Sequence, residues 1–313
     1  MFIGVKKVRF MARIISEIRN RFLSENIVGK FIYVNVGVYV LFAFLDVVAT
    51  LFNVKSPVLY IKLWLELPSS LSQFVVQPWS LVTYMFMHGG LMHILFNMIM
   101  LYCFGKIFLS YFSTRHFVGV YLLGGIAGGL FFMLAYNIFP FFSSSVSYAG
   151  LVGASAAVLA VVTATAYRVP DYRIRLLLIG EVTLKSFAIA TVVISVLLTT
   201  SDNAGGAFAH IGGALAGYLF AHYLNKGRDI TFYINKAVDG IVNLCNRLFS
   251  KAKTPKMKIF RGKHADDYEY KSREKRRDED VDRILEKVKR SGYASLTEDE
   301  KKRLFDASGQ NRS

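Results

Sequence analysis

Four polar residues lie inside long apolar stretches of this 313-residue chain, and their types suit acyl transfer: His93, Asn97, Ser155 and His210. A serine hydroxyl is a weak nucleophile until a base removes its proton, and histidine is the usual base. A second histidine and an asparagine amide can donate hydrogen bonds to an oxyanion, together with the Ser155 backbone N–H. Because such groups are costly in apolar surroundings, each is a functional hypothesis by default.

The apolar stretches that hold these residues have the length of membrane spans. Hydrophobic residues make up 53% of the chain, and a helix needs about 20 apolar residues to cross roughly 30 Å of hydrocarbon. Six segments approach or meet that length: residues 31–52, 90–112, 117–138, 148–167, 184–198 and 204–224. Lipid offers the backbone no hydrogen-bond partners, so these segments should be helices. The sequence predicts an all-α polytopic membrane protein with a six-helix bundle over residues 31–224, and not a soluble globule, a disordered chain or a disulfide scaffold.

The distribution of Lys and Arg predicts the orientation. Residues 1–30 hold seven basic residues. Six more lie in or beside the connections after the second and fourth spans, whereas the opposite loops hold only Lys55 and Lys62. An excess of basic residues marks the cytoplasmic side. Both termini are therefore expected in the cytoplasm, in a membrane such as the bacterial inner membrane. Residues 1–30 have no apolar core of a secretory signal, and we expect an amphipathic helix on the inner surface there.

This topology brings the four polar residues to one depth. His93 and Asn97 are four residues apart and share a helix face. At about 1.5 Å per residue, they lie roughly 5 to 10 Å below the outer end of their span, Ser155 roughly 10 Å below the start of its own, and His210 roughly 9 Å. Acidic residues are absent from the outer halves of the spans that hold these histidines, and only Asp202 lies in a nearby loop. A hydrolase built from these groups would be a Ser-His dyad without a carboxylate.

At this point the chain resembles the rhomboid intramembrane serine proteases. The matching stretches are His88-Gly-Gly-Leu-Met-His93-Ile-Leu-Phe-Asn97, Gly153-Ala-Ser155-Ala156 and Ala209-His210-Ile-Gly-Gly213 with Gly217. The resemblance implies that Ser155 is the nucleophile, His210 the general base, and His93 and Asn97 the oxyanion-hole side chains. It further implies cleavage of single-span membrane proteins near the outer face, with no metal or cofactor.

The sequence departs from the family pattern at three places. Ala156 follows the serine where the family usually has glycine, and a methyl at this position is expected to crowd the serine loop. Leu159 stands where many members have a tyrosine stacked on the histidine. Neither Trp64 nor Trp79 is followed by the arginine that many members carry in the first outer loop.

Other interpretations of the same residues stay open. Ser155 could be a packing residue and the His93–Asn97 pair interhelical glue, and the Gly213–Gly217 spacing is first a close-packing device, expected to bring the sixth span against the fourth. His210 could line an ion path. The main alternative function is a catalytically inactive relative that binds membrane helices in quality control or trafficking. A small-solute transporter is disfavoured, because the sequence shows no internal repeat of broken helices.

The last 88 residues differ from the rest, with 23 basic and 15 acidic residues. Residues 225–280 are expected to be a charged juxtamembrane linker, part of it along the anionic inner leaflet. Val281, Ile284, Leu285 and Val288 repeat at helical spacing up to Gly292, and Thr297 with Glu300 predicts a capping box that opens a second helix. Residues 281–313 should therefore form a small helical hairpin. Nucleic-acid binding is the minor interpretation of its charge, because acidic residues are interspersed.

Overall fold

The computed structural model describes residues 20–54, 56–176, 180–199, 204–249 and 279–309. The chain forms two compact units, residues 1–247 and 248–313. Most of the amphipathic helix expected in residues 1–30 falls on residues 1–19, which lie outside the described residues. Residues 250–278 of the expected linker also lie outside them. The sequence predicts a domain boundary at 224/225, whereas the two compact units divide at 247/248. The difference arises because most of the helix at residues 232–249 belongs to the first unit.

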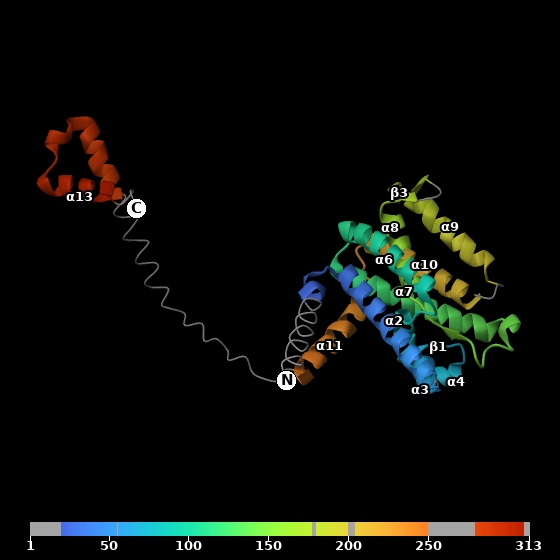
Figure 1. Ribbon diagram of the computed structural model, residues 1–313. Helices are drawn as coiled ribbons and strands as arrows, with labels where there is room; N and C mark the ends of the chain where they lie inside the picture. The colour runs from blue at the N-terminus through green and yellow to red at the C-terminus, as the bar shows by residue number, and fades with distance from the viewer. Residues whose placement is uncertain (1–19, 55, 177–179, 200–203, 250–278, 310–313) are drawn as a thin grey trace, which may run out of the picture. The chain divides into compact units, whose positions relative to one another are not determined.

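The first unit is a bundle of helices, seen in Figure 1. The six that correspond to the predicted spans are α2 (Ile27–Leu51), α6 (Leu91–Tyr111), α7 (Thr114–Ile138), α8 (Ser155–Arg168), α9 (Leu184–Leu197) and α10 (Ala204–Asn225). Among the described residues, α2, α6, α7 and α10 are long and apolar enough to cross a membrane, while α8 and α9 have 14 residues each. The result is the polytopic helical membrane bundle that the sequence predicted.

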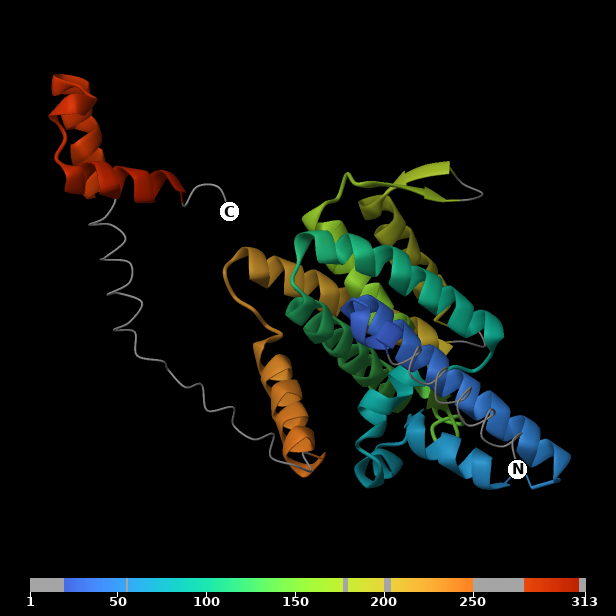
Figure 2. The same ribbon diagram turned by 60° about the vertical axis from the view of Figure 1, so that its left-hand side comes forward.

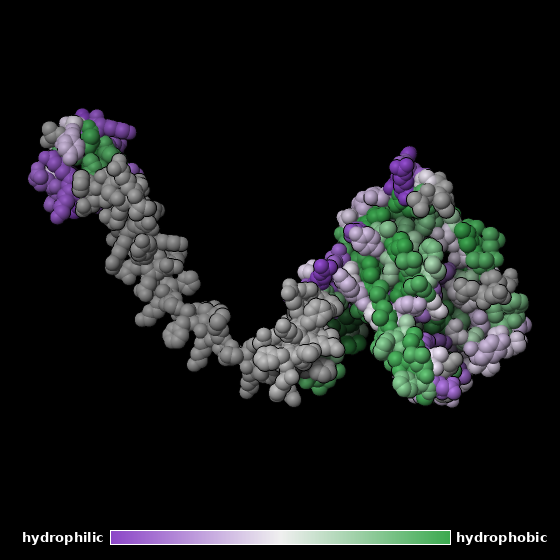
Figure 3. All heavy atoms as spheres, viewed as in Figure 1, coloured by the Kyte–Doolittle hydropathy of each residue, from purple (hydrophilic) through white to green (hydrophobic). Residues whose placement is uncertain are grey.

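Apolar side chains cover the outside of this bundle. On α2, Val40, Phe44 and Val47 are each more than half exposed, and Figure 3 shows a broad hydrophobic surface over the bundle. A soluble monomer rarely exposes an apolar surface of this extent. The protein is therefore an integral membrane protein, in which these side chains face lipid.

The predicted fourth span, residues 148–167, is wrong at its start. The helix begins only at Ser155, and Gly150–Leu151 form the short strand β2. Gly153, with φ of +127°, adopts a backbone conformation that L side chains rarely take, so the segment cannot be helical there. Ser155 thus lies at the first residue of α8 and not about two turns inside it, and its depth is set by the preceding loop.

The long connection between α2 and α6 packs against the loop that precedes Ser155. It contains α3 (Ser56–Leu65), β1 (Leu67–Pro68), α4 (Leu71–Val76), α5 (Ser80–Thr83) and the 3-10 turn η1 (Tyr84–Phe86). Strand β1 pairs antiparallel with β2, with Leu67 opposite Leu151. The Trp64 and Trp79 rings stack 5.4 Å apart, which braces the connection. A second strand pair that the sequence did not predict, β3 (Arg173–Leu176) with β4 (Gly180–Thr183), lies at the opposite end of the bundle from α3 and α4 (Figures 1 and 2).

Glycines let α8 lie against its neighbours at very short range. A Cβ on Gly213 of α10 would lie 2.2 Å from the Ala156 carbonyl oxygen, and one on Gly217 would lie 2.1 Å from that of Ala160. On the other side, a Cβ on Gly124 of α7 would lie 2.2 Å from the Ala160 Cβ. Small residues permit this close approach of membrane helices. The packing of the sixth predicted span against the fourth is confirmed.

Helix α11 (Phe232–Phe249) follows the bundle, and all but its last two residues belong to the first unit. Its Asp239 accepts a hydrogen bond of 2.6 Å from Arg115, which precedes the third predicted span. Phe232, Tyr233, Ile241 and Leu248 expose apolar side chains, and Lys236 and Arg247 are basic. These features suit a helix at the membrane surface, as the sequence predicted for part of this region.

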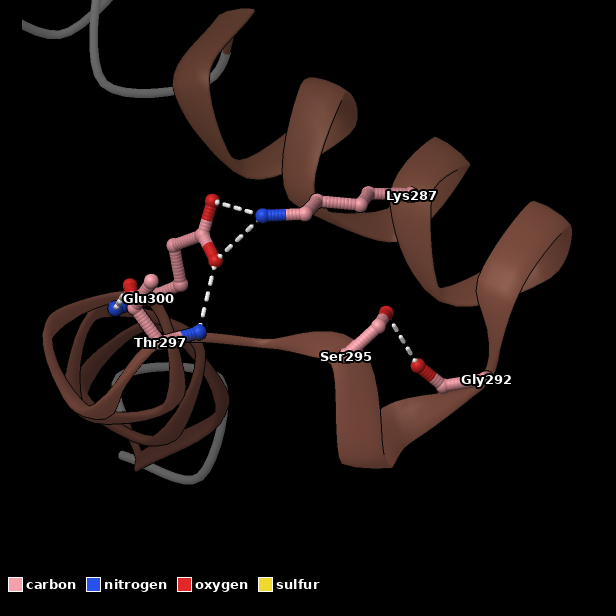
Figure 4. Close-up of polar contacts among 5 residues, drawn as sticks. All are labelled: Lys287, Gly292, Ser295, Thr297 and Glu300. Carbon is pink, nitrogen blue, oxygen red and sulfur yellow. Dashed lines mark hydrogen bonds and ion pairs between the residues drawn. The ribbon is translucent and has the colours of Figure 1, made fainter.

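The second unit contains the predicted hairpin. Residues 279–291 are helical, Gly292 has φ of +74°, and η3 (Tyr293–Ser295) leads to α13 (Glu298–Gly309). The capping box is confirmed, because the Thr297 N–H donates to Glu300 Oε2 at 2.8 Å and the Glu300 N–H to Thr297 Oγ1 at 3.4 Å. Lys287 also donates to both Glu300 oxygens, which links the two helices (Figure 4).

Candidate functional site

The four predicted polar side chains line a single cavity of about 660 Å³. His93 and Asn97 come from α6, Ser155 from the start of α8 and His210 from α10. Apolar side chains, among them Leu159 and Phe132, form most of the remaining wall. The structure therefore brings together the residues that the sequence singled out.

The position of Ser155 at a helix start gives it a polar backbone environment. The first intrahelical bond of α8 runs from the Val158 N–H to the Ala154 carbonyl, at 2.9 Å. The N–H groups of Ser155 and the next two residues consequently have no carbonyl partner within the helix, and the positive end of the helix dipole lies there. Negative charge that develops beside the serine would be stabilised by this arrangement.

Gly153 allows the His93 imidazole to approach the serine loop. A Cβ at this position would lie 2.8 Å from both Cε1 and Nε2 of His93, closer than real Cβ contacts come. The Gly153 N–H donates to the Tyr84 carbonyl at 3.0 Å, and the Tyr84 hydroxyl donates to the Gly125 carbonyl at 2.6 Å. The loop is thus anchored on η1 and α7, with the His93 ring directly beside it.

Asn97 is buried and keeps one amide hydrogen for the cavity. Its Nδ2 donates to the His93 carbonyl at 2.8 Å. Since a primary amide carries two N–H bonds, the second one is available to a ligand. His93 and Asn97 together with the α8 terminus can therefore supply several hydrogen-bond donors to one oxygen atom.

The methyl group of Ala156 does not crowd the serine loop. Ala156 is 1% exposed and is not part of the cavity wall. Its Cβ faces α7, where a Cβ on Gly128 would lie only 2.5 Å away. The extra methyl therefore fills the space that Gly128 leaves open, and the expected crowding is absent.

His210 has a hydrogen-bond partner that the sequence analysis missed. Its Nδ1 lies 3.2 Å from Oγ of Ser195, on α9. Ser195 is only 3% exposed. Among the described residues no hydrogen bond joins Ser155 to His210, so the ring is held in this structure through Nδ1. The sequence offers only a serine in an apolar span as a signal for Ser195, and this signal is weak because serine and threonine commonly bond to the preceding turn of such helices.

A second, more polar cavity of about 310 Å³ lies beside the first, and Val152 contributes to both walls. It is lined by Glu66, His88 and the Asp46–Lys62 ion pair. Burial raises the pKa of the Glu66 carboxyl, which Lys62 opposes. Burial, and secondly the neighbouring His93, lowers the pKa of His88 to about 4, so this imidazole is neutral at pH 7. The His88 and His93 rings meet edge to face at 5.2 Å, and His88 thereby supports the mouth of the site.

Comparison with known protein families agrees with this architecture. Residues 76–227, from α4 to just beyond α10, match the rhomboid domain. Residues 266–310 match a family of unknown function (DUF6576), and this range contains both helices of the hairpin. No curated protein matches the chain. The bundle, its cavity and the family match lead to one conclusion: this chain contains a rhomboid domain.

Proposed function

We propose that this protein is an intramembrane serine protease that cleaves membrane-embedded substrates through Ser155 and His210. The observation that carries the proposal is the shared cavity, in which a serine at a helix N-terminus, a histidine and two further hydrogen-bonding side chains come from three helices. Each of these groups has a role in acyl transfer. The rhomboid family includes the intramembrane proteases that the sequence resembles.

In the proposed reaction, Ser155 Oγ attacks the substrate carbonyl carbon and its proton passes to His210 Nε2. The carbonyl oxygen becomes an oxyanion, which accepts hydrogen bonds from His93, Asn97 and the Ser155 N–H. Collapse of the intermediate breaks the peptide C–N bond, and the His210 proton goes to the leaving amine. Water then attacks the acyl carbon and gives a proton to His210, and the ester C–O bond breaks as His210 passes that proton to Ser155 Oγ. The Ser155–His210 bond that this needs would form on substrate binding, since catalytic hydrogen bonds are often long in unliganded enzymes.

The substrates we propose are single-span membrane proteins cut near the outer face. The basic N-terminal segment and inner loops support a cytoplasmic location of both termini, in a membrane such as the bacterial inner membrane. Peptide bonds in a helix are shielded by their own hydrogen bonds. A substrate must therefore unwind locally before its carbonyl meets Ser155, and a helix-weakened sequence favours this step.

The alternative is an inactive rhomboid-family protein that binds membrane helices. Ala156, at a position where the family usually has glycine, is the sequence feature that favours this alternative, and the fit of its methyl against Gly128 removes that support. The two functions differ in one measurable step, the formation of an acyl-enzyme or its analogue on Ser155.

The test is cleavage of a single-span reporter by the purified protein in liposomes. Wild type should cleave, and Ser155→Ala and His210→Ala should not. His222→Ala is the matched control for the second variant, because His222 is on the same helix and contacts Tyr167 outside the cavity. A serine-directed fluorophosphonate should label wild type but not Ser155→Ala. Labelling that persists in Ser155→Ala, or cleavage by it, would show that the assignment is wrong.

A further inference from the structure

The buried hydroxyl of Ser195 contacts the proposed catalytic base. Its Oγ takes part in two short contacts, one with the Thr191 carbonyl oxygen at 2.8 Å and one with His210 Nδ1 at 3.2 Å. Both partners are fixed, since Thr191 precedes Ser195 by one turn of α9 and His210 belongs to α10. Two contacts and one hydroxyl proton limit how the hydrogens can be arranged.

The Thr191 carbonyl can only accept, so the hydroxyl proton must point toward it for that contact to be a hydrogen bond. The contact with His210 is then a hydrogen bond only if Nδ1 carries a proton and donates to Ser195 Oγ. In the other tautomer, Nδ1 and the carbonyl would both be acceptors competing for one proton. The Thr191 carbonyl keeps the helical hydrogen bond from the Ser195 N–H in either case. The Nδ1–H tautomer is favoured because it makes both hydroxyl contacts hydrogen bonds, whereas the other tautomer makes only one of them, in a site that is 3% exposed at Ser195.

We propose that Ser195 is a positioning residue that holds neutral His210 as the Nδ1–H tautomer. This inference rests on the proposed function for its catalytic meaning. In this tautomer Nε2 carries the lone pair, which is the form that can accept a proton from Ser155. The hydrogen bond at one imidazole nitrogen sets the protonation of the other.

Ser195 thereby takes over one task of the carboxylate in a Ser-His-Asp triad. No acidic side chain lines the cavity in the part of the chain that the structure describes. A neutral hydroxyl fixes the tautomer and the ring plane, and it keeps accepting from Nδ1–H when His210 becomes an imidazolium. Being uncharged, it gives that cation less stabilisation than a carboxylate does.

The experiment compares two variants of nearly the same shape. Ser195→Thr keeps the hydroxyl and Ser195→Val replaces it with a methyl, so any crowding by the added methyl is common to both. In liposomes, we expect Ser195→Val to lower kcat roughly tenfold relative to Ser195→Thr, the factor that about one hydrogen bond carries. KM should be the same for both, because Ser195 does not line the cavity wall. Ser186→Ala, near the start of the same helix, is the control for loss of a hydroxyl from α9.

The tautomer itself is measured by nitrogen-15 NMR of histidine-labelled protein, with the His210 signals assigned by their loss in His210→Gln. Wild type and Ser195→Thr should show a protonated Nδ1 and an unprotonated Nε2, and Ser195→Val should show a mixture of the two tautomers. A protonated Nε2 in neutral wild type, or equal kcat of the Thr and Val variants, would overturn the inference. If wild type cleaves no substrate and binds no fluorophosphonate, the proposed function fails, while the NMR result still decides the role of Ser195.

Discussion

A close contact between α8 and α10 predicts that one added methyl group causes a large loss of activity. Gly213 of α10 faces the backbone of Ala156, the residue after the proposed nucleophile. A Cβ on Gly213 would lie 2.2 Å from the Ala156 carbonyl oxygen, whereas ordinary contact begins at 3.4 Å. The shortfall of 1.2 Å falls on backbone atoms, which cannot rotate away as a side chain does. In Gly213→Ala the two helices must therefore separate or tilt by about that distance.

This displacement acts directly on the proposed dyad. His210 precedes Gly213 by three residues on α10, and Ser155 is adjacent to Ala156 on α8. A misplacement of about 1 Å of reacting groups can lower the rate by roughly a hundredfold. Overpacking of this kind also lowers the free energy of unfolding by about 1–3 kcal/mol. We expect Gly213→Ala to remain folded with kcat/KM reduced on the order of a hundredfold.

The assay is reporter cleavage in liposomes, combined with thermal unfolding of the same preparation. Gly37→Ala is the matched control, because it adds a methyl within the spanning helix α2 where nothing lies within 4 Å. It should cleave like wild type. Wild-type kcat/KM in a stably folded Gly213→Ala would show that the contact between α8 and α10 does not determine the geometry of the site.

Three further predictions concern the serine loop and the tail. Gly153→Ala should lower kcat roughly a hundredfold, the scale for loss of one oxyanion donor, because its methyl would lie 2.8 Å from the His93 ring; unchanged kcat would contradict the placement of His93. Ala156→Gly should leave kcat unchanged and cost about 1 kcal/mol of stability, since the methyl faces Gly128 and not the cavity; a rise in kcat on reporter cleavage would show that the methyl does obstruct the site. The Glu300 carboxylate accepts hydrogen bonds from Lys287 and from the Thr297 N–H, and these bonds keep the pKa of this carboxyl below the usual 4.5. The hairpin is therefore stabilised above about pH 4.5 and loses this contribution as the pH falls through the lower, folded-state pKa. Amide hydrogen exchange of α13 in the full chain, compared with Glu300→Gln, should show this pH dependence in wild type alone.

The membrane bundle followed from the sequence because its cause is local. Each long apolar run must satisfy its own backbone hydrogen bonds in lipid, so length and composition suffice to identify α2, α6, α7 and α10. The rule failed at residues 148–154, which are apolar but not helical. There the pairing of β2 with β1 and the positive φ of Gly153 outweigh the local preference, and β1 is more than 80 residues earlier in the chain.

The candidate site was predictable in its members but not in its internal connections. His93, Asn97 and His210 stand out because strongly polar groups are rare in apolar spans, and Ser155 joins them because the predicted topology places it at the same depth. Ser195 does not stand out, since serine and threonine are common in such helices, where they bond to the preceding turn. Which of the α9 hydroxyls meets His210 depends on how α9 packs against α10.

The sequence by itself determined that this chain forms a polytopic helical membrane domain and which four polar residues belong together, because both depend on the cost of polar groups in lipid. The tertiary structure alone decided that α8 begins at Ser155, that the Ala156 methyl fits against Gly128, and that Ser195 bonds to the Nδ1 of His210. Those facts depend on contacts between segments distant in the chain, and hydrophobic pattern and spacing do not encode distances of that kind.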